Sequence, residues 1–302
     1  MVETETRDAP QYLTVKEVAA LLRVKERKVY DLVSAGDIPC SRAMGKLLFN
    51  RQAVERWLSG HTSGEAGTRT DSPSEPRPNV FLGSHDPLLD WALRESRCGL
   101  ATFFDSSRDG LERFAAHEGL AAGVHIPNKG EGWNTEAVEK RFGSEPVVLV
   151  EWAKRLRGLI VAPGSEMRFP NFGALAGHKV AVRQAEAGSQ VLFDRLMREA
   201  GLAADAVEPI GPVLSETDSA LMVADGKADA AFGLKAIARQ YRLGFAPVIV
   251  ERYDLLVCRR AWFEPPFQTL LAFCREQAFI RRAEEMEGYD VTRLGRVYFN
   301  GP

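Results

Sequence analysis

The chain has 302 residues, of which 45% are hydrophobic and 26% are charged, as in an ordinary folded protein. This length predicts about two domains. The formal charge of −2 excludes a uniformly basic nucleic-acid coat and an acidic disordered tail. No apolar run approaches the roughly 18 residues that cross a membrane, and the polar first residues do not form a secretory signal. We therefore expect a cytoplasmic protein that makes no membrane contact.

A stretch rich in Gly, Ser, Thr and Pro divides the chain. Residues 59–79 contain almost no apolar side chain, so they cannot bury enough surface to offset the entropy of ordering. The sequence predicts a flexible linker here, between a small domain at residues 1–58 and a larger one at residues 80–302. Gln11–Leu58 holds nine basic and five acidic residues, a charge of +4 that leaves −6 for the rest. A small basic domain is attracted to a phosphate backbone.

Two helices are predicted in the small domain. Thr14 and Glu17 have the spacing of a capping box, which predicts a helix that begins at Val15. A second helix is predicted from Glu26 to a left-handed cap at Gly36. Two helices joined by a short turn, the second of them basic, form a helix-turn-helix.

A small hairpin follows, with its turn at residues 43–46, and residues 52–58 are predicted to form a closing helix. The run LTVKEVAALLRVKERKVYDLVSAGDIPCSR, followed by GK and F, resembles the MerR/excisionase type of winged helix-turn-helix. The resemblance implies binding to double-stranded DNA, with the second helix in the major groove and the hairpin on the backbone. The candidate DNA-binding residues are Lys25, Arg27, Lys28, Tyr30, Arg42 and Lys46.

One such domain covers few base pairs, so we expect a homodimer on paired half-sites. The alternative for the small domain is a protein-interaction module whose charges are merely solvated.

Strands and helices alternate in the larger domain. Strands are predicted at residues 79–83, 99–104, 121–126, 147–150, 158–161, 179–182 and 228–233, and helices at 87–94, 108–117, 189–200, 219–225 and 235–241. This alternation predicts an α/β fold with mostly parallel sheets, and the length of the segment suits two lobes. The aromatic-rich segment 261–279 is expected to supply core and a helix packed on the first lobe, with an oligomer surface as the alternative.

Polar residues recur where predicted strands give way to helices. An anion site is built at such places from helix N-termini, hydroxyls and backbone N–H groups. The candidate ligand-binding residues are Ser84, His85, Ser106, Ser107, His125, Arg183, Gln184, Ser189 and Gln190. Plainer roles stay open for some of these residues and for Asp86. Ser84, Asp86 and Ser107 could be helix caps, His125 a core histidine, and Arg183 the partner of an acid across a hinge.

The larger domain resembles the periplasmic-binding-protein-like domain of type II that follows helix-turn-helix domains in bacterial regulators. The resemblance is carried, in chain order, by GSHDPLLDWAL, AAGVHIPN, RLRGLIVAPG, VRQAEAGSQVLFDRLM, ADGKADAAFGL and FAPVIVERYDLLVCRR. It implies a two-lobed α/β fold, with chain crossings near residues 150–158 and 245–251, that closes around a ligand in the cleft.

The resemblance extends to molybdate- and tungstate-binding proteins and implies that the chain senses such an oxyanion. Many relatives have Gly-Ser-Gly-Thr-Arg where the helix after Arg183 begins, whereas this chain has Ala-Gly-Ser-Gln-Val at residues 187–191. The arginine is missing, so another small anion or a polar metabolite stays open as the ligand.

The expected function is that of a ligand-responsive transcription regulator, not an enzyme. The chain has no GxSxG, P-loop, HExxH or GxGxxG motif. The cysteines, which are Cys40, Cys98, Cys258 and Cys274, show no pairing or metal spacing. A metal site of His85, His125 and Asp86 is a weak alternative.

We expect no cofactor beyond the small effector. Asp225, Asp229 and Glu251 are interpreted as residues of helix ends and sheet edges rather than as catalytic carboxylates. The alternative function is a carrier or enzyme on a binding-protein fold.

Overall fold

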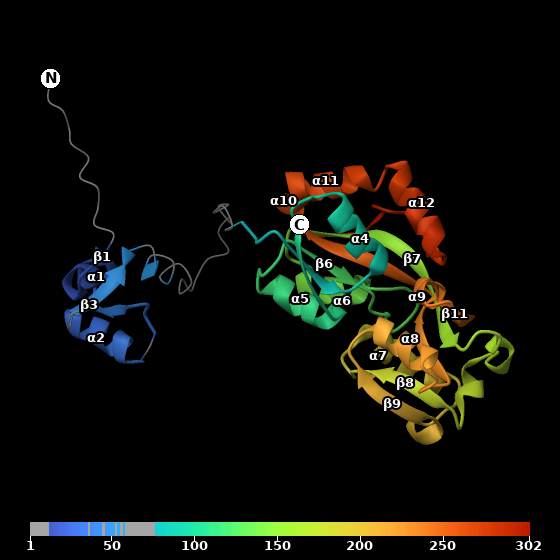
Figure 1. Ribbon diagram of the computed structural model, residues 1–302. Helices are drawn as coiled ribbons and strands as arrows, with labels where there is room; N and C mark the ends of the chain where they lie inside the picture. Colours follow the sequence, from blue (N-terminus) through green and yellow to red (C-terminus); the bar gives the residue numbers. More distant parts are fainter. Residues whose placement is uncertain (1–11, 36, 44–45, 52, 55–56, 58–75) are drawn as a thin grey trace. The chain divides into compact units, whose positions relative to one another are not determined.

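The computed structural model describes residues 12–35, 37–43, 46–51, 53–54, 57 and 76–302 (Figure 1). The chain divides into two compact units, Met1–Ser74 and Glu75–Pro302, each with its own hydrophobic core. The predicted linker lies outside the described residues up to residue 75. Within the described part of the chain, no helix is both long and apolar enough to cross a membrane.

The N-terminal unit contains the predicted helix-turn-helix and hairpin. Its elements are β1 (Tyr12–Leu13), α1 (Val15–Leu22), α2 (Glu26–Ala35), β2 (Ser41–Ala43) and β3 (Lys46–Asn50). Thr14 caps α1 as predicted, because its hydroxyl accepts from the Glu17 amide at 3.4 Å and the Glu17 carboxylate accepts from the Thr14 amide at 2.7 Å. Val18, Val29 and Phe49 are fully buried, so both helices pack on the sheet.

The sequence missed β1, which pairs with β3 and makes the sheet three-stranded in the order β1-β3-β2. Two predicted features fall outside the described residues, namely the cap at Gly36 and the tip of the hairpin at residues 44–45. The predicted closing helix lies partly outside them, but Ala53, Val54 and Trp57 are helical.

The first lobe of the C-terminal unit begins with three parallel strands in the order β5-β4-β6. Its elements are β4 (Val80–Ser84), α4 (Pro87–Glu95), β5 (Ala101–Asp105), α5 (Ser107–Ala115), β6 (Ala121–Val124) and α6 (Thr135–Phe142). The strands β4, β5 and β6 all end at the same edge of the sheet, because they are parallel. The side chains just after them are therefore brought together.

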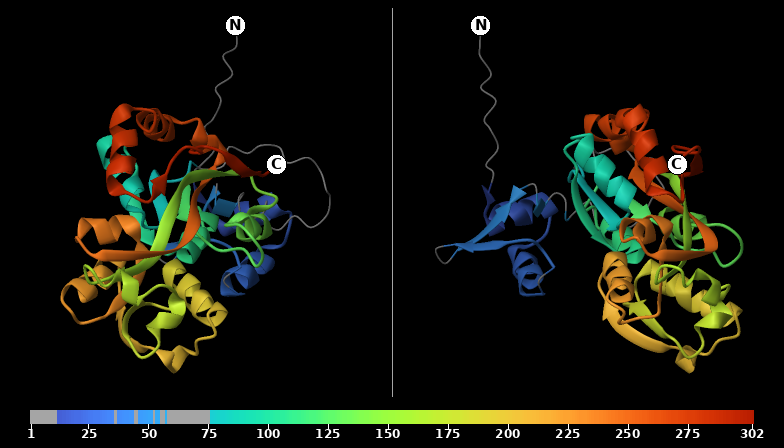
Figure 2. Two further views of the ribbon diagram at one scale, coloured as in Figure 1. Left: turned by 90° about the vertical axis from the view of Figure 1, so that its right-hand side faces the viewer. Right: turned by 45° about the vertical axis from the view of Figure 1, so that its right-hand side comes forward.

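Two long antiparallel strands, β7 (Val147–Val161) and β11 (Gly244–Cys258), connect the lobes (Figure 2). In the first lobe β11 pairs with β6, and in the second lobe β7 pairs with β10. The prediction of separate strands at 147–150 and 158–161 is wrong. Both segments belong to the one continuous strand β7, in which Glu151, Arg155 and Arg157 are buried.

The second lobe repeats the βα alternation around parallel strands in the order β10-β8-β9. Its elements are β8 (Lys179–Arg183), α7 (Gly188–Glu199), β9 (Glu208–Val213), α8 (Glu216–Ala224), β10 (Ala230–Leu234) and α9 (Lys235–Gln240), with three short 3-10 helices at Glu166–Arg168, Phe172–Leu175 and Ala204–Ala206. The ten-stranded sheet of the C-terminal unit is thus mixed, parallel within each lobe and antiparallel along β7 and β11.

The C-terminal segment returns to the first lobe. It forms α10 (Arg259–Trp262), α11 (Pro265–Phe273), α12 (Gln277–Met286), β12 (Tyr289–Asp290) and β13 (Val297–Asn300). Phe267, Leu270 and Phe279 are buried in the first-lobe core, as the sequence predicted for the segment 261–279. Figure 1 shows these helices beside α4, over one side of the first lobe.

Substitution of Gly83 by Ala tests the close packing of the first lobe. Gly83 has φ +95°, and a Cβ there would overlap the backbone of Gly123 on β6. Gly99 also has a positive φ, +77°, but open space around it. Both alanines meet the same backbone penalty, so we expect Gly83→Ala to destabilise the chain by about 2 kcal/mol more than Gly99→Ala. Equal urea midpoints for the two variants would contradict this packing.

Candidate functional site

The exposed face of α2 carries the predicted DNA contacts. Arg27, Lys28 and Tyr30 are exposed, whereas Val29 between them is fully buried and anchors the helix. Lys25 is exposed in the turn before α2. Arg42 and Lys46 belong to β2 and β3, and their side chains lie outside the described residues. The helix therefore offers two cations and a phenol to a partner.

A cavity of about 310 Å³ lies in the C-terminal unit where the strands of both lobes end. Its lining residues from the first lobe are Ser84, His85, Pro87, Phe104, Asp105 and His125, and those from the second lobe are Arg183, Ala187, Gly188, Ser189, Leu214, Ser215, Glu216, Thr217, Leu234 and Ile237. Charged and hydroxyl groups face one another across it. The cavity thus suits a small polar molecule.

Hydrogen-bond donors gather on the second-lobe wall. Helix α7 begins there, and its first residues have no side-chain cap. Ser189 is 3% exposed, and its hydroxyl has no hydrogen-bond partner among the described residues. Arg183 ends the strand before α7 and also lines the cavity, while its Nη2 donates to the Leu214 carbonyl at 2.6 Å. An uncapped helix N-terminus beside an arginine is a favourable place for an anionic group.

The nine candidate ligand-binding residues fall into three groups. Ser84, His85, His125, Arg183 and Ser189 line the cavity, whereas Ser106 and Gln184 line a neighbouring groove between the lobes. Ser107 is buried outside the cavity lining, and Gln190 lines a separate pocket of the second lobe.

Ser107 and Gln190 form hydrogen bonds to residues that line the cavity. The Ser107 hydroxyl pairs with that of Ser84 at 2.8 Å and accepts from the His125 amide at 3.1 Å. The Gln190 side chain accepts from the Arg183 amide at 2.8 Å. Of the helix caps left open by the sequence, the structure has Asp86 capping α4 at 2.7 Å, and it adds Ser106, which caps α5 at 3.1 Å.

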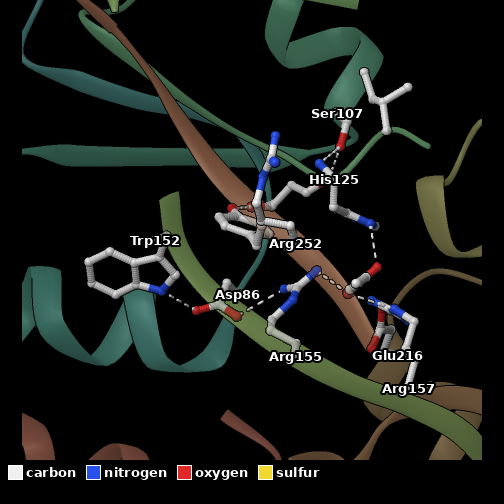
Figure 3. Close-up of polar contacts among 12 residues, drawn as sticks. Asp86, Ser107, His125, Trp152, Arg155, Arg157, Glu216 and Arg252 are labelled. Carbon is white, nitrogen blue, oxygen red and sulfur yellow. Dashed lines mark hydrogen bonds and ion pairs between the residues drawn. The ribbon is translucent and has the colours of Figure 1, made fainter. Parts of the chain in front are cut away.

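A chain of buried ion pairs runs beneath the cavity from one lobe to the other (Figure 3). Asp86 of the first lobe accepts from Arg155 Nη1 at 2.9 Å, and Arg155 pairs with Glu251. Glu251 also lies 2.7 Å from Arg157 Nε, and Arg157 Nη2 donates to Glu216 of the second lobe at 2.7 Å. We call these five residues the ion chain. It joins the two lobes through the long strands β7 and β11.

The first-lobe end of the ion chain is saturated with hydrogen bonds. The Asp86 carboxylate also accepts from the Leu89 amide at 2.7 Å, from Trp152 Nε1 at 3.1 Å and from the Tyr289 hydroxyl at 2.7 Å. At the opposite end, Glu216 Oε2 and Arg157 Nη1 are buried without a hydrogen-bond partner among the described residues. The unsatisfied end is the one beside the cavity.

The electrostatics of the ion chain determine the protonation state of His125. Burial alone would raise the pKa of Glu251, but the guanidinium groups of Arg155 and Arg157 outweigh it and hold that pKa well below its usual value. Burial lowers the pKa of His125 by more than nearby Glu251 raises it, so the imidazole is neutral. Its Nδ1 lies 3.2 Å from the Glu251 carboxylate and therefore carries the proton. Its Nε2 is left as an acceptor.

The interpretation of Glu251 as a sheet-edge residue is wrong, because Glu251 is fully buried within β11. The sequence also missed Arg155, Arg157 and Glu216. One signal was available, since Arg155 and Arg157 are two residues apart and so lie on one face of a strand. Of the residues in the weak alternative of a metal site, Asp86 pairs with Arg155 and His125 contacts Glu251. Among the described residues, no cluster of His, Cys, Asp and Glu is placed to hold a metal.

Comparison with known proteins identifies both units. Residues 91–275, more than half of the chain, match the PBP superfamily domain. The chain belongs to the PBP superfamily. Residues 12–62 match a helix-turn-helix domain of the excisionase-like kind. The chain is therefore a helix-turn-helix domain fused to a two-lobed periplasmic-binding-protein-like domain, as the sequence predicted.

Two bacterial proteins are similar in sequence to this PBP-superfamily chain. The uncharacterized protein YvgK of Bacillus subtilis is 22% identical over 306 residues, which cover 94% of this chain and 96% of YvgK. A protein from the 5′ region of the ferredoxin 2Fe-2S gene of Clostridium pasteurianum is 30% identical over 76 residues, or 25% of this chain and 67% of that protein.

Several solved structures are similar to this PBP-superfamily chain. Holo ArgBP of T. maritima has 15% identity and a TM-score of 0.42, over 68% of this chain and 93% of that one. The aliphatic sulphonate binding protein SsuA of Escherichia coli has 17% identity and a TM-score of 0.41, over 68% and 77% of the two chains. Neither likeness bears on the ligand of this chain.

Neutralising Glu251 tests the ion chain. The variant Glu251→Gln leaves two buried arginines short of a counter-charge, so we expect a loss of about 3–5 kcal/mol in the free energy of unfolding. The control is Glu199→Gln, because Glu199 pairs with Arg195 at 2.7 Å on the surface, and such a pair contributes about 1 kcal/mol or less. Both values come from urea denaturation at pH 7. Equal losses in the free energy of unfolding for the two variants would contradict the burial of the ion chain.

Comparison of the native chain with Glu251→Gln also predicts how the free energy of unfolding depends on pH. The pKa of Glu251 is lowered on folding, so the unfolded chain binds more protons below about pH 4.5. The contribution of Glu251 is therefore present above that pH and is lost as the pH falls through the lowered pKa. We expect the stability of the native chain to fall more steeply in acid than that of Glu251→Gln.

Proposed function

We propose that this protein is a ligand-responsive, DNA-binding regulator of transcription. The observation that carries the proposal is the presence, on one chain, of a helix-turn-helix with an exposed basic helix and a PBP-superfamily domain with a polar cavity. Binding of a small effector in the cavity changes the arrangement of the lobes, and this change alters the affinity for DNA.

On the DNA side, we propose that α2 enters the major groove and that the β2–β3 wing contacts the backbone. Arg27, Lys28 and Tyr30 are the exposed candidates on α2 for these contacts. A single small domain covers few base pairs, so the proposed active form is a homodimer on two half-sites.

On the ligand side, we propose that the anionic group of the effector binds at the start of α7, beside Ser189 and Arg183. The uncapped helix end and the unpartnered Ser189 hydroxyl support this placement. Molybdate and tungstate are candidate effectors, because the sequence resembles proteins that bind them.

We further propose that the protein binds its effector without transforming it. The residues best suited to acid–base chemistry, His125 and Glu251, are held by each other and by the two arginines of the ion chain. Glu251 is fully buried behind the cavity wall. Their contacts support a structural role.

Removal of two charges from α2 tests DNA binding. We expect Arg27→Ala/Lys28→Ala to weaken binding to the protein's own promoter region by about 30-fold or more, and to reduce the salt dependence by about two ion equivalents. The matched control is Lys140→Ala/Arg141→Ala, which removes two exposed charges from the end of α6. Gel shifts at several salt concentrations measure both. Undiminished binding by the α2 variant would show that α2 is not the recognition helix.

Thermal unfolding tests the anion site. Ligand at a hundredfold excess over its Kd stabilises by about 2.7 kcal/mol, which raises the Tm of a unit of this size by about 5–10 °C. We expect such a shift from an anionic effector in a screen of molybdate, tungstate and small carboxylates. Arg183→Met abolishes the shift, whereas Arg198→Met, which alters an exposed residue near the end of α7, preserves it. A shift that survives Arg183→Met would place the anion elsewhere.

A further inference from the structure

Besides the donors at the start of α7, the cavity is lined by hydrogen-bond acceptors. Glu216 is the first residue of α8, whose N-terminus is already capped by Ser215 and Asp218 in a capping box. The Glu216 side chain is therefore not needed as a cap. It lines the cavity instead and gives only one of its two oxygens to Arg157, at 2.7 Å.

The second oxygen of Glu216 is buried without a hydrogen-bond partner among the described residues. Opposing charges keep this carboxylate ionised, since Arg157 and Arg155 lower its pKa against the effect of burial. A buried carboxylate oxygen that lacks a donor is unfavourable, and a donor brought by a ligand relieves it.

His125 adds a second acceptor to the same cavity. Its Nδ1 is bound to Glu251, so its Nε2 accepts hydrogen bonds. The ring lies against the start of α7, because a Cβ on Gly188 would come within 2.9 Å of Cε1 and 3.1 Å of Nε2. This acceptor is therefore next to the place proposed for the anionic group.

The local charge also weighs against a bare divalent anion. The cavity wall and the ion chain together hold three arginines and four carboxylates, a formal balance of −1. They are Arg155, Arg157 and Arg183 against Asp86, Asp105, Glu216 and Glu251. A ligand that carries a donor or a cation beside its anionic group matches this balance better than a dianion does.

We propose that Glu216 selects the effector, and that the effector is a small carboxylate with a hydroxyl or ammonium group next to the carboxylate. The carboxylate binds at the start of α7, and the hydroxyl or ammonium donates to Glu216 and His125. This inference rests on the proposed function, since it concerns the same cavity.

Matched ligands test the proposal by calorimetry on the full chain. The probes are unbranched carboxylates of three to six carbons, each as the plain acid, the 2-hydroxy acid and the 2-amino acid, together with molybdate, tungstate and sulfate. We expect at least one hydroxy or amino acid to bind at least about tenfold more tightly than its plain acid and than every oxyanion. Comparison of the 2-hydroxy acid with the 2-amino acid of the same length shows whether a hydroxyl or an ammonium donor is preferred.

The variant Glu216→Gln tests whether the charge of Glu216 discriminates between donor-bearing carboxylates and oxyanions. It keeps an oxygen for Arg157 but loses the charge, so donor-bearing carboxylates should bind about tenfold more weakly and oxyanions more tightly. Glu199→Gln removes one negative charge at the far end of α7 and should change neither affinity. Thermal unfolding of both variants verifies that they are folded before binding is compared.

Two results would overturn the proposal. One is tighter binding of molybdate or tungstate than of every hydroxy and amino acid, unchanged by Glu216→Gln. In that case the proposed regulatory function would be retained, with an oxyanion as the effector. The other is no binding by any donor-bearing carboxylate up to about 10 mM. By contrast, a bound hydroxy or amino acid that leaves DNA binding unchanged would support the ligand class and refute the regulator.

Discussion

The buried pair of Arg155 and Glu251 is the interaction on which the C-terminal unit depends. Arg155 is 1% exposed and Glu251 is fully buried, so neither charge is solvated by water. Each would be very unfavourable alone, and together they still require further partners for their remaining polar atoms. Asp86 supplies one such partner in the first lobe, and Arg157 with Glu216 continues the pairing into the second.

This pairing explains why β7 and β11 remain continuous through the region between the lobes. The charged side chains on the two strands face one another in register, since Glu251 is the cross-strand partner of Arg155. A loop at this point would expose them to water and separate them. The two lobes are therefore connected by paired strands together with the ion chain, and not by single unpaired segments.

The sequence predicts what depends on neighbours along the chain. The capping box at Thr14, the helix-turn-helix and most βα units are local patterns, and the cavity residues Ser84, His125 and Ser189 follow from the rule that parallel strands end at one edge. The ion chain is not local, because Arg155 pairs with residues 69 and 96 positions away. A charged residue in an apolar run suggests a break when its distant partner is unknown. The sequence likewise does not indicate that Gln190 accepts from the Arg183 amide and lines a separate pocket instead of the cavity.

Regulation requires that the effector bind one arrangement of the lobes better than another, since equal affinity for both would leave their relative populations unchanged. The cavity meets this requirement through its composition. Ser84 and His125 come from the first lobe, and Ser189 and Glu216 come from the second, so a ligand that touches both sets favours the arrangement in which they face each other. Glu216 is also one end of the ion chain, whereas its opposite end at Asp86 is fixed by four donors. A ligand bound to Glu216 would therefore contact the less saturated end of an ion chain whose other end is anchored in the first lobe.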